Sequence, residues 1–135
     1  MEREARCLCG SLTIWVSGNP SFSIACNCIN CQRRTGSSFG TLAYFKDDQV
    51  LEQKGEFKKF QFQSDSGRTN TTHFCPECGS TVFFKAEAFK GMTGVAAGCF
   101  PSPDIPEPTM AVWTRSKHSW VEFPEHWTSM EQQTP

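Results

Sequence analysis

Apolar and polar residues alternate over short stretches of this chain, and turn residues such as Gly, Pro and Asn separate the stretches. Leu12, Ile14 and Val16, for example, stand at every second position, and a Gly-Asn-Pro turn follows them. A period of two is typical of a strand that buries one face. The same reasoning predicts further short strands at residues 22–25, 39–45, 50–53, 57–63, 68–74, 81–85, 92–99 and 110–114.

The rest of the pattern contains little helix. Residues 29–34 are predicted to form one helical turn, and residues 100–108 hold four of the eight prolines, so they are predicted to be an irregular loop. The segment from Glu125 onward is polar and is predicted to fray. We therefore expect a mostly β fold of several small antiparallel sheets. With 135 residues, the chain is expected to form one compact domain over 1–135, with its core at about residues 4–124.

Charge and hydropathy exclude several classes of partner. The formal net charge is -1, which gives no electrostatic basis for binding nucleic acid or an acidic membrane. No apolar run approaches the roughly 20 residues that a membrane-spanning helix needs. The first ten residues, MEREARCLCG, lack the apolar region of a signal peptide. We expect a cytoplasmic protein with no nucleic-acid or membrane partner.

Seven of the eight cysteines stand in three close groups, C-x-C, C-x-C-x-x-C and C-x-x-C. In a reducing compartment such thiols are more often metal ligands than disulfides. Sulfurs of a C-x-C pair converge easily on one metal ion but are poorly placed to bond to each other. The cysteines are therefore interpreted as zinc ligands, with the small sheets arranged around the zinc sites.

The first and last groups together suit a closed tetrahedral site. Cys7 and Cys9 supply two sulfurs, and Cys75 and Cys78 supply the other two. Each pair is followed by a glycine, which permits a tight backbone turn beside the metal. We predict a structural zinc at these four cysteines, because the ion would tie the N-terminal strand to a later hairpin.

The central group, Cys26, Cys28 and Cys31, supplies only three sulfurs. Three protein ligands and one open position are the pattern of a catalytic zinc. Three thiolates leave Zn²⁺ with a net charge of -1, which weakens it as a Lewis acid but suits the binding and exchange of a substrate thiol. Arg33 and Arg34 follow directly and could offset this charge or hold a substrate carboxylate. Anion binding is assigned here to Arg33.

The residues alone leave a second interpretation of this group open. It could be another closed structural site, with Cys99, His73 or His118 as the fourth ligand. Cys99 belongs to no close pair and is interpreted as a free buried thiol in a strand. Trp15 and Trp113 are candidates to line a pocket, although alternating strands also use such residues in the core.

The motifs in this order resemble the glutathione-dependent formaldehyde-activating enzyme family, which also includes centromere protein V. The resemblance runs from about Cys7 through Pro108. It is carried by C-L-C-G-S at residues 7–11, C-N-C-I-N-C-Q-R at 26–33, G-S at 36–37, S-G at 66–67 and F-C-P-E-C-G-S at 74–80. The chain departs from many relatives at Asn27, where they often carry His.

The resemblance implies a fold, two zinc ions and an activity. It implies compact small β-sheets, like those of a Rab-binding accessory protein of exchange factors. It implies a structural zinc at Cys7, Cys9, Cys75 and Cys78, and a catalytic zinc at Cys26, Cys28 and Cys31. The implied activity joins formaldehyde and glutathione to S-hydroxymethylglutathione and is classed, in reverse, as a carbon–sulfur lyase.

Two hypotheses of different classes follow. The first is a zinc-dependent carbon–sulfur lyase that acts on a thiol adduct, with glutathione as the thiol that the resemblance suggests. The second is a non-enzymatic, zinc-stabilised binding module, or a glutathione carrier without turnover. The fourth ligand of the central zinc distinguishes them, because a protein ligand there favours the module and a free position favours the enzyme.

Overall fold

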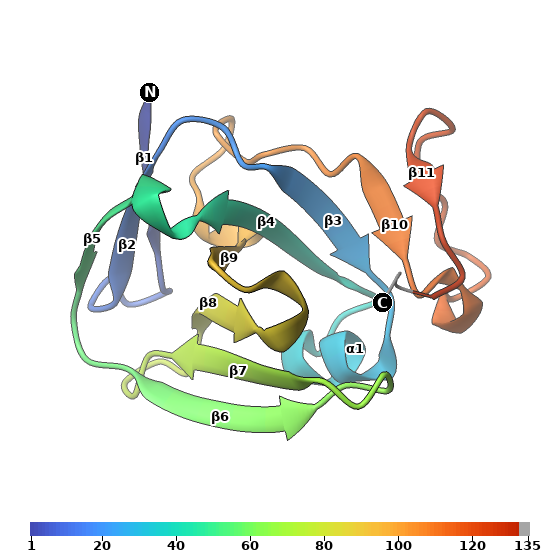
Figure 1. The fold of residues 1–135 in the computed structure, drawn as a ribbon, viewed down its shortest axis with the longest axis horizontal. Helices are drawn as coiled ribbons and strands as arrows, with labels where there is room; N and C mark the ends of the chain where they lie inside the picture. Colours follow the sequence, from blue (N-terminus) through green and yellow to red (C-terminus); the bar gives the residue numbers. More distant parts are fainter. Residues whose placement is uncertain (133–135) are drawn as a thin grey trace.

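Two β-sheets form the framework of the structure, a computed structural model that describes residues 1–132 (Figure 1). The smaller sheet has the order β1 (Glu2–Arg6), β2 (Thr13–Ser17), β5 (Val50–Lys54). The larger sheet has the order β11 (Thr128–Ser129), β10 (Met110–Val112), β3 (Phe22–Cys26), β4 (Gly40–Lys46), β9 (Met92–Ala96), β8 (Thr81–Ala86), β7 (Thr69–Phe74), β6 (Lys58–Gln63). Neighbouring strands are antiparallel, except that β10 runs parallel to both β3 and β11.

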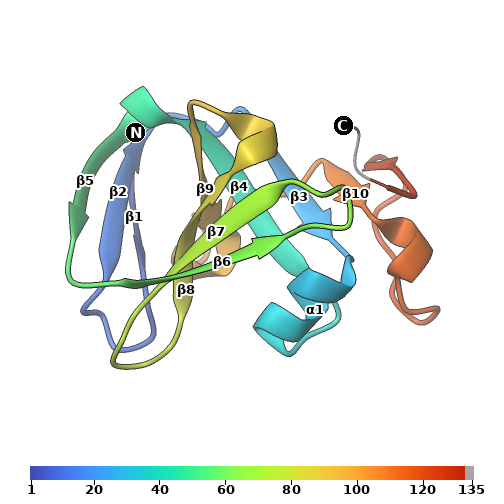
Figure 2. The same ribbon diagram turned by 60° about the horizontal axis from the view of Figure 1, so that its bottom comes forward.

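Helices are short and lie between the strands. The α-helix α1 (Ile29–Thr35) follows β3 directly and contacts β4, as Figure 2 shows from below. Four 3₁₀ turns complete the described chain: η1 (Asp47–Gln49), η2 (Glu87–Phe89), η3 (Ala97–Cys99) and η4 (Thr114–Ser116). Within residues 1–132, no helix has the length and apolar character to cross a bilayer.

The predicted mostly β architecture is confirmed, and every predicted strand overlaps an observed one. The strand β1 was not predicted, because its sequence EREAR contains only one apolar residue, Ala5. It forms by pairing with β2 at the sheet edge, where charged side chains remain in water. The helix at residues 29–34 is also confirmed and extends by one residue.

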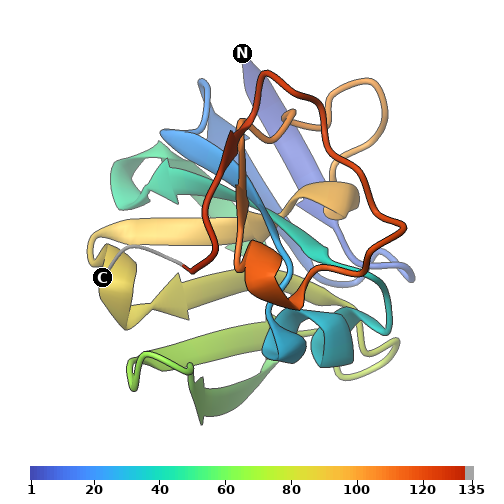
Figure 3. The same ribbon diagram turned by 90° about the vertical axis from the view of Figure 1, so that its right-hand side faces the viewer.

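Three predicted boundaries are wrong. The strand predicted at residues 92–99 ends at Ala96, and η3 follows, so Cys99 lies in a 3₁₀ turn. The strand predicted at 110–114 ends at Val112, because Trp113 adopts a left-handed conformation with φ 56°. The polar segment after Glu125 does not simply fray, since β11 pairs with β10 along the outer edge seen in Figure 3. Residues 133–135 of that predicted tail lie outside the described residues.

The strand β4 divides the interior into two cores. Ala43 and Phe45 point to one side and pack with residues of the smaller sheet, including Ile14. Leu42 and Tyr44 point to the other side and pack with residues that β3, β8 and the end of β10 supply, namely Ile24, Phe84, Val112 and Trp113. This follows from the period of two along a strand that is covered on both faces. Cys7 and Cys75 lie in the first core, and Cys26 lies in the second.

Candidate metal centres and the cavity beside them

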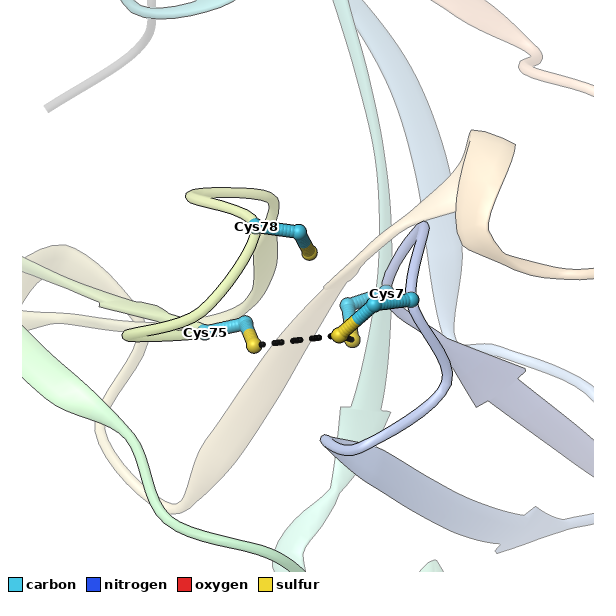
Figure 4. A group of neighbouring side chains, drawn as sticks. Cys7, Cys75 and Cys78 are labelled. Atoms are coloured by element: carbon cyan, nitrogen blue, oxygen red, sulfur yellow. Dashed lines mark hydrogen bonds between the residues drawn. The ribbon is translucent and has the colours of Figure 1, made fainter.

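Four cysteines from two turns converge where the smaller sheet meets the larger one. Cys7 and Cys9 lie in the turn between β1 and β2, and Cys75 and Cys78 lie in the turn between β7 and β8. Figure 4 shows Cys7, Cys75 and Cys78 with their side chains turned toward one another. Their sulfur atoms all lie within 4.8 Å of one another, so this group could hold a metal ion. Gly10 and Gly79 close the two turns with φ angles of 84° and 80°, which side-chain-bearing residues rarely adopt.

The sulfur spacing fits a tetrahedral zinc site. The Sγ atom of Cys9 lies 3.7 Å from the sulfurs of both Cys7 and Cys75. A tetrahedron with Zn–S distances of about 2.3 Å has sulfur–sulfur edges of about 3.8 Å. The amide N–H groups of Leu12 and Glu77 donate to the sulfurs of Cys7 and Cys75 at 3.3 and 3.4 Å. Such donors stabilise thiolates, which are the ionisation state that metals bind.

The other three cysteines come from one continuous segment. Cys26 is the last residue of β3, Cys28 is the N-cap of α1, and Cys31 lies in the first turn of that helix. Their sulfurs lie within 4.8 Å of one another and could also hold a metal ion. The Cys28 sulfur accepts the Cys31 amide at 3.3 Å, so the same contact begins the helix and orients one sulfur.

The three thiols compete for one negative charge. Hydrogen bonds from the thiols of Cys26 and Cys31 lower the pKa of Cys28 to about 3, with further help from nearby amides. The same contact with Cys28, then that with Cys31, and then burial raise the pKa of Cys26. Three thiolates at this spacing would repel one another, so they need a bound cation. Without a cation, two of the sulfurs keep their protons and donate hydrogen bonds to the third.

Hydrogen bonds to β10 fix the loop that carries these cysteines. The backbone amide and the Nδ2 group of Asn27 each donate to the Val112 carbonyl at 3.0 Å. Gln32 Nε2 donates to the carbonyls of Asn27 and Ser116, at 2.9 and 3.1 Å. Asn27 is fully buried. The position of the three sulfurs therefore depends on a strand more than 80 residues further along the chain.

None of the candidate fourth ligands joins the three-cysteine group. His73 is buried elsewhere, where it stacks on Phe83 with ring centres 4.3 Å apart. His118 contacts Gln32 through its Nε2 atom at 3.0 Å. Cys99 is half-buried, and its thiol donates to the Thr81 carbonyl at 3.6 Å. Among the described residues, the group contains three His, Cys, Asp or Glu ligands and no fourth.

The two arginines after Cys31 differ in position. Arg33 is exposed and does not line the cavity beside the cysteines, whereas Arg34 does. The Arg34 guanidinium lies 4.6 Å from the centre of the Phe84 ring. Its Nη2 atom is buried and has no hydrogen-bond partner within residues 1–132. It also approaches β4 closely, since a Cβ atom on Gly40 would lie 2.7 Å from Nη2.

A cavity opens beside the three cysteines. Cys26, Cys28 and Cys31 form part of its lining, together with Arg34. An apolar wall comes from β3, β4, β6, β8, η2 and the end of β10, and a polar rim comes from the turn between β6 and β7. Sequence reasoning singled out Trp113 but missed Tyr44, Phe84 and Arg68. Arg34 was named together with Arg33, and its position three residues after Cys31 on the same helix was a signal that favours it over Arg33.

Comparison with known proteins agrees with this arrangement. A crystal structure of a Rhodobacter sphaeroides protein has a TM-score of 0.59 and 19% sequence identity, and the match covers 78% of this chain and 96% of that chain. At this identity the likeness concerns the fold alone. A search of curated proteins found no match. The sequence model of the glutathione-dependent formaldehyde-activating enzyme family matches residues 2–116, which include both cysteine groups. The chain therefore belongs to the glutathione-dependent formaldehyde-activating enzyme family.

Proposed function

We propose that this chain is a zinc-dependent carbon–sulfur lyase that forms or cleaves the adduct of a thiol and a small carbonyl compound. The observation that carries the proposal is a group of three cysteine sulfurs, with no fourth protein ligand in the described chain, at the wall of a cavity. An open ligand position that faces a cavity is typical of catalytic rather than structural zinc. The family description names glutathione and formaldehyde, and these are the first substrates to test. A cytoplasmic location remains a prediction.

The four-cysteine group is assigned a structural zinc in this proposal. Its sulfurs approach tetrahedral spacing, and they come from turns that lie 66 residues apart. A metal at this position links the two sheets and excludes a substrate, because all four ligands come from the protein. Zinc at the three-cysteine group would act differently, since it would hold an incoming thiol as thiolate. Two zinc ions per chain are therefore expected.

The residues around the three cysteines have assigned roles in the reaction. The substrate sulfur forms a bond to the carbonyl carbon, the carbonyl π electrons move to oxygen, and that oxygen takes a proton from water while the thiol proton is lost to solvent. Burial, followed by the nearby sulfurs of Cys31 and Cys26, raises the pKa of Tyr44, so its hydroxyl keeps its proton. It lines the cavity and is assigned as hydrogen-bond donor to the developing alkoxide.

Arg34 is assigned to balance charge. Three thiolates and one Zn²⁺ carry a net charge of -1, and the binding of a substrate thiolate adds another negative charge. The buried Nη2 atom of Arg34 has no acceptor in the described chain, and its guanidinium borders the same cavity. A positive charge there favours the thiolate form of the substrate. We prefer Arg34 to Arg33 for this role, because Arg33 does not border the cavity.

The test combines metal content with turnover. Cys28→Ser should lose one zinc per chain and all formation of S-hydroxymethyl adduct, measured by exchange spectroscopy on formaldehyde and a thiol. Its circular dichroism spectrum should match that of the unaltered protein. Cys99→Ser is the matched control, because Cys99 lies outside both groups, and it should keep two zinc ions and full turnover. Unchanged turnover in Cys28→Ser would contradict the proposal, and thiol binding without turnover in the unaltered protein would identify a carrier.

A further inference from the structure

We propose that the thiol substrate of this chain carries an aromatic or similarly bulky apolar group together with a carboxylate, rather than being the peptide glutathione. The inference rests on the proposed function, since it takes the three-cysteine group as the place where the thiol sulfur binds. It comes from the remaining walls of the cavity. One part of these walls is apolar and includes aromatic side chains, and the rest is polar and includes two arginines.

The apolar wall is a poor partner for a peptide thiol. Its side chains include Ile24, Leu42, Phe62, Phe84, Phe89 and Trp113. Phe89 also packs against the Tyr44 ring, with centres 4.8 Å apart, so the aromatic surface is continuous with the core. Glutathione would place amide groups against this surface, and burying an amide without a hydrogen-bond partner weakens binding. An aromatic ring of the substrate would instead gain contact area and edge-to-face packing.

The backbone at Trp113 supports a ligand-binding role for this wall. Trp113 has φ 56°, the left-handed region that a bulky side chain rarely occupies, and it is the only described residue other than glycine with a positive φ. Such a strained conformation is unfavourable and tends to occur at ligand sites. Its indole ring is 7% exposed, lines the cavity, and lies 5.0 Å from the Arg115 guanidinium carbon. The ring is thus held in place before any substrate arrives.

Arg68 is assigned to the carboxylate of the substrate. It lies immediately before β7, in the hairpin turn that forms the polar rim, and its side chain is half-buried. Asp65 lies on the same turn and is exposed, but it forms no ion pair with Arg68 within the described chain. The guanidinium of Arg68 therefore remains available for a bidentate contact with a carboxylate. Arg34 is already assigned to the sulfur end of the cavity, so the two arginines divide the two charges of the substrate.

A series of four thiols tests the inference on the zinc-loaded protein. The first is 2-mercapto-3-phenylpropanoate, which has both features. The second is 2-phenylethanethiol, which lacks the carboxylate, the third is mercaptoacetate, which lacks the ring, and the fourth is glutathione. Dissociation constants come from titration calorimetry. In the cobalt-substituted protein, an added cobalt–sulfur band, which is near-ultraviolet charge-transfer absorption above that of the cysteine ligands, reports the bond to the substrate sulfur. The first thiol should bind about tenfold or more tightly than each of the other three.

Two pairs of variants assign the contacts. Phe62→Ala should weaken the two phenyl thiols about tenfold and leave mercaptoacetate unchanged. Trp120→Ala is its control, because Trp120 is 71% exposed and does not line the cavity, whereas the nearer Phe60 stacks on the Phe62 ring. Arg68→Gln should weaken 2-mercapto-3-phenylpropanoate about tenfold and leave 2-phenylethanethiol unchanged. Lys58→Gln, an exposed cation of the same hairpin, should change neither.

The outcomes separate this inference from the function on which it rests. Glutathione that binds as tightly as the phenyl acid, with the cobalt–sulfur band, would overturn the inference and leave the lyase proposal intact. No increase in charge-transfer absorption with any thiol would overturn both. If the phenyl acid binds most tightly but Arg68→Gln and Phe62→Ala bind it like their controls, the assigned contacts are wrong and the inference fails.

Discussion

Gly94 is predicted to be the least replaceable small residue in the sheet that carries the cavity. It lies in β9 and pairs with Tyr44 on one side and with Phe84 on the other. The Tyr44 ring covers it, so a Cβ atom added to Gly94 would lie 2.8 Å from Cε1 and 2.9 Å from Cζ of that ring. The ring cannot move aside easily, because Phe22 and Phe89 pack against it at 5.0 and 4.8 Å. Gly94→Ala therefore forces a displacement in a closed packing arrangement.

The size of the effect follows from this overlap. Overpacking a well-packed core costs about 1–3 kcal/mol. Replacing Gly by Ala also lowers the conformational entropy of the unfolded chain. This stabilises the folded protein by about 0.4–1 kcal/mol where the native backbone conformation is one that alanine can adopt. Gly98→Ala isolates that second contribution, because Gly98 is exposed and an added Cβ atom meets nothing within 4 Å. The difference between the two variants should therefore equal the packing cost, about 1–3 kcal/mol.

Urea unfolding of zinc-loaded protein, followed by circular dichroism, measures both free energies of unfolding. Gly94→Ala should unfold at lower urea than the unaltered protein, and Gly98→Ala at equal or higher urea. In a Tyr44→Leu background the penalty of Gly94→Ala should shrink, because the leucine side chain leaves room beside β9. Equal stability of Gly94→Ala and Gly98→Ala would refute the assigned position of the Tyr44 ring.

Three further predictions concern the metal groups and one surface contact. Cys75→Ser should lose one zinc and most of the cooperative unfolding transition, because the four-cysteine site contributes folding free energy on the order of 10 kcal/mol. Melting curves and a metal assay measure the two losses. The control Cys99→Ser should keep both zinc ions and the cooperative transition. Asn27→Ala should lower the zinc affinity of the three-cysteine group about tenfold and leave the zinc at the four-cysteine group in place. Competition with a chelator measures the two affinities, and equal loss of both ions would contradict the prediction. Asp47→Asn should cost about 0.5 kcal/mol near pH 7, because Lys85 first and Thr93 next hold the pKa of Asp47 below its usual value. Because the pKa of Asp47 is lower in the folded state than in the unfolded chain, its carboxylate stabilises the fold at a pH above the unfolded-state pKa. The stability difference between Asp47→Asn and the unaltered protein, measured by urea unfolding, should therefore vanish as the pH falls below about 4.

Local patterns in the sequence predicted the strands and the grouping of the cysteines. Strand alternation is visible because one buried face repeats every two residues, as it does in β2. The cysteine groups were recognisable because their members stand close together along the chain, and the structure brings the same four and the same three together. By contrast, β1 gave no such signal, because its sequence has no apolar face. It forms a strand because it pairs with β2.

The cavity could not be predicted in the same way. Its wall combines residues from β3, β4, β8 and the end of β10, and only the register of the sheet brings them together. Anion binding was assigned to Arg33 rather than Arg34, although a single predicted helical turn does not show which of the two arginines lies near the three cysteines. With α1 formed, Arg34 lies on the side of Cys31, and Arg33 points to solvent. Trp113 had a weak signal as an aromatic residue, but its left-handed backbone is a property of the fold alone.

The hydrogen bonds from Asn27 to Val112 have a consequence for the order of events during protein synthesis. A ribosome adds about 5–20 residues per second, and a chain folds as its segments emerge. The turns that carry Cys7, Cys9, Cys75 and Cys78 are available once β8 has emerged, so the sheets can be joined early. The loop of Cys26, Cys28 and Cys31 must wait for β10, which is made seconds later. If the four-cysteine group binds a metal as proposed, a nascent chain that stops before Met110 should hold that metal while its three-cysteine group is still not held in position.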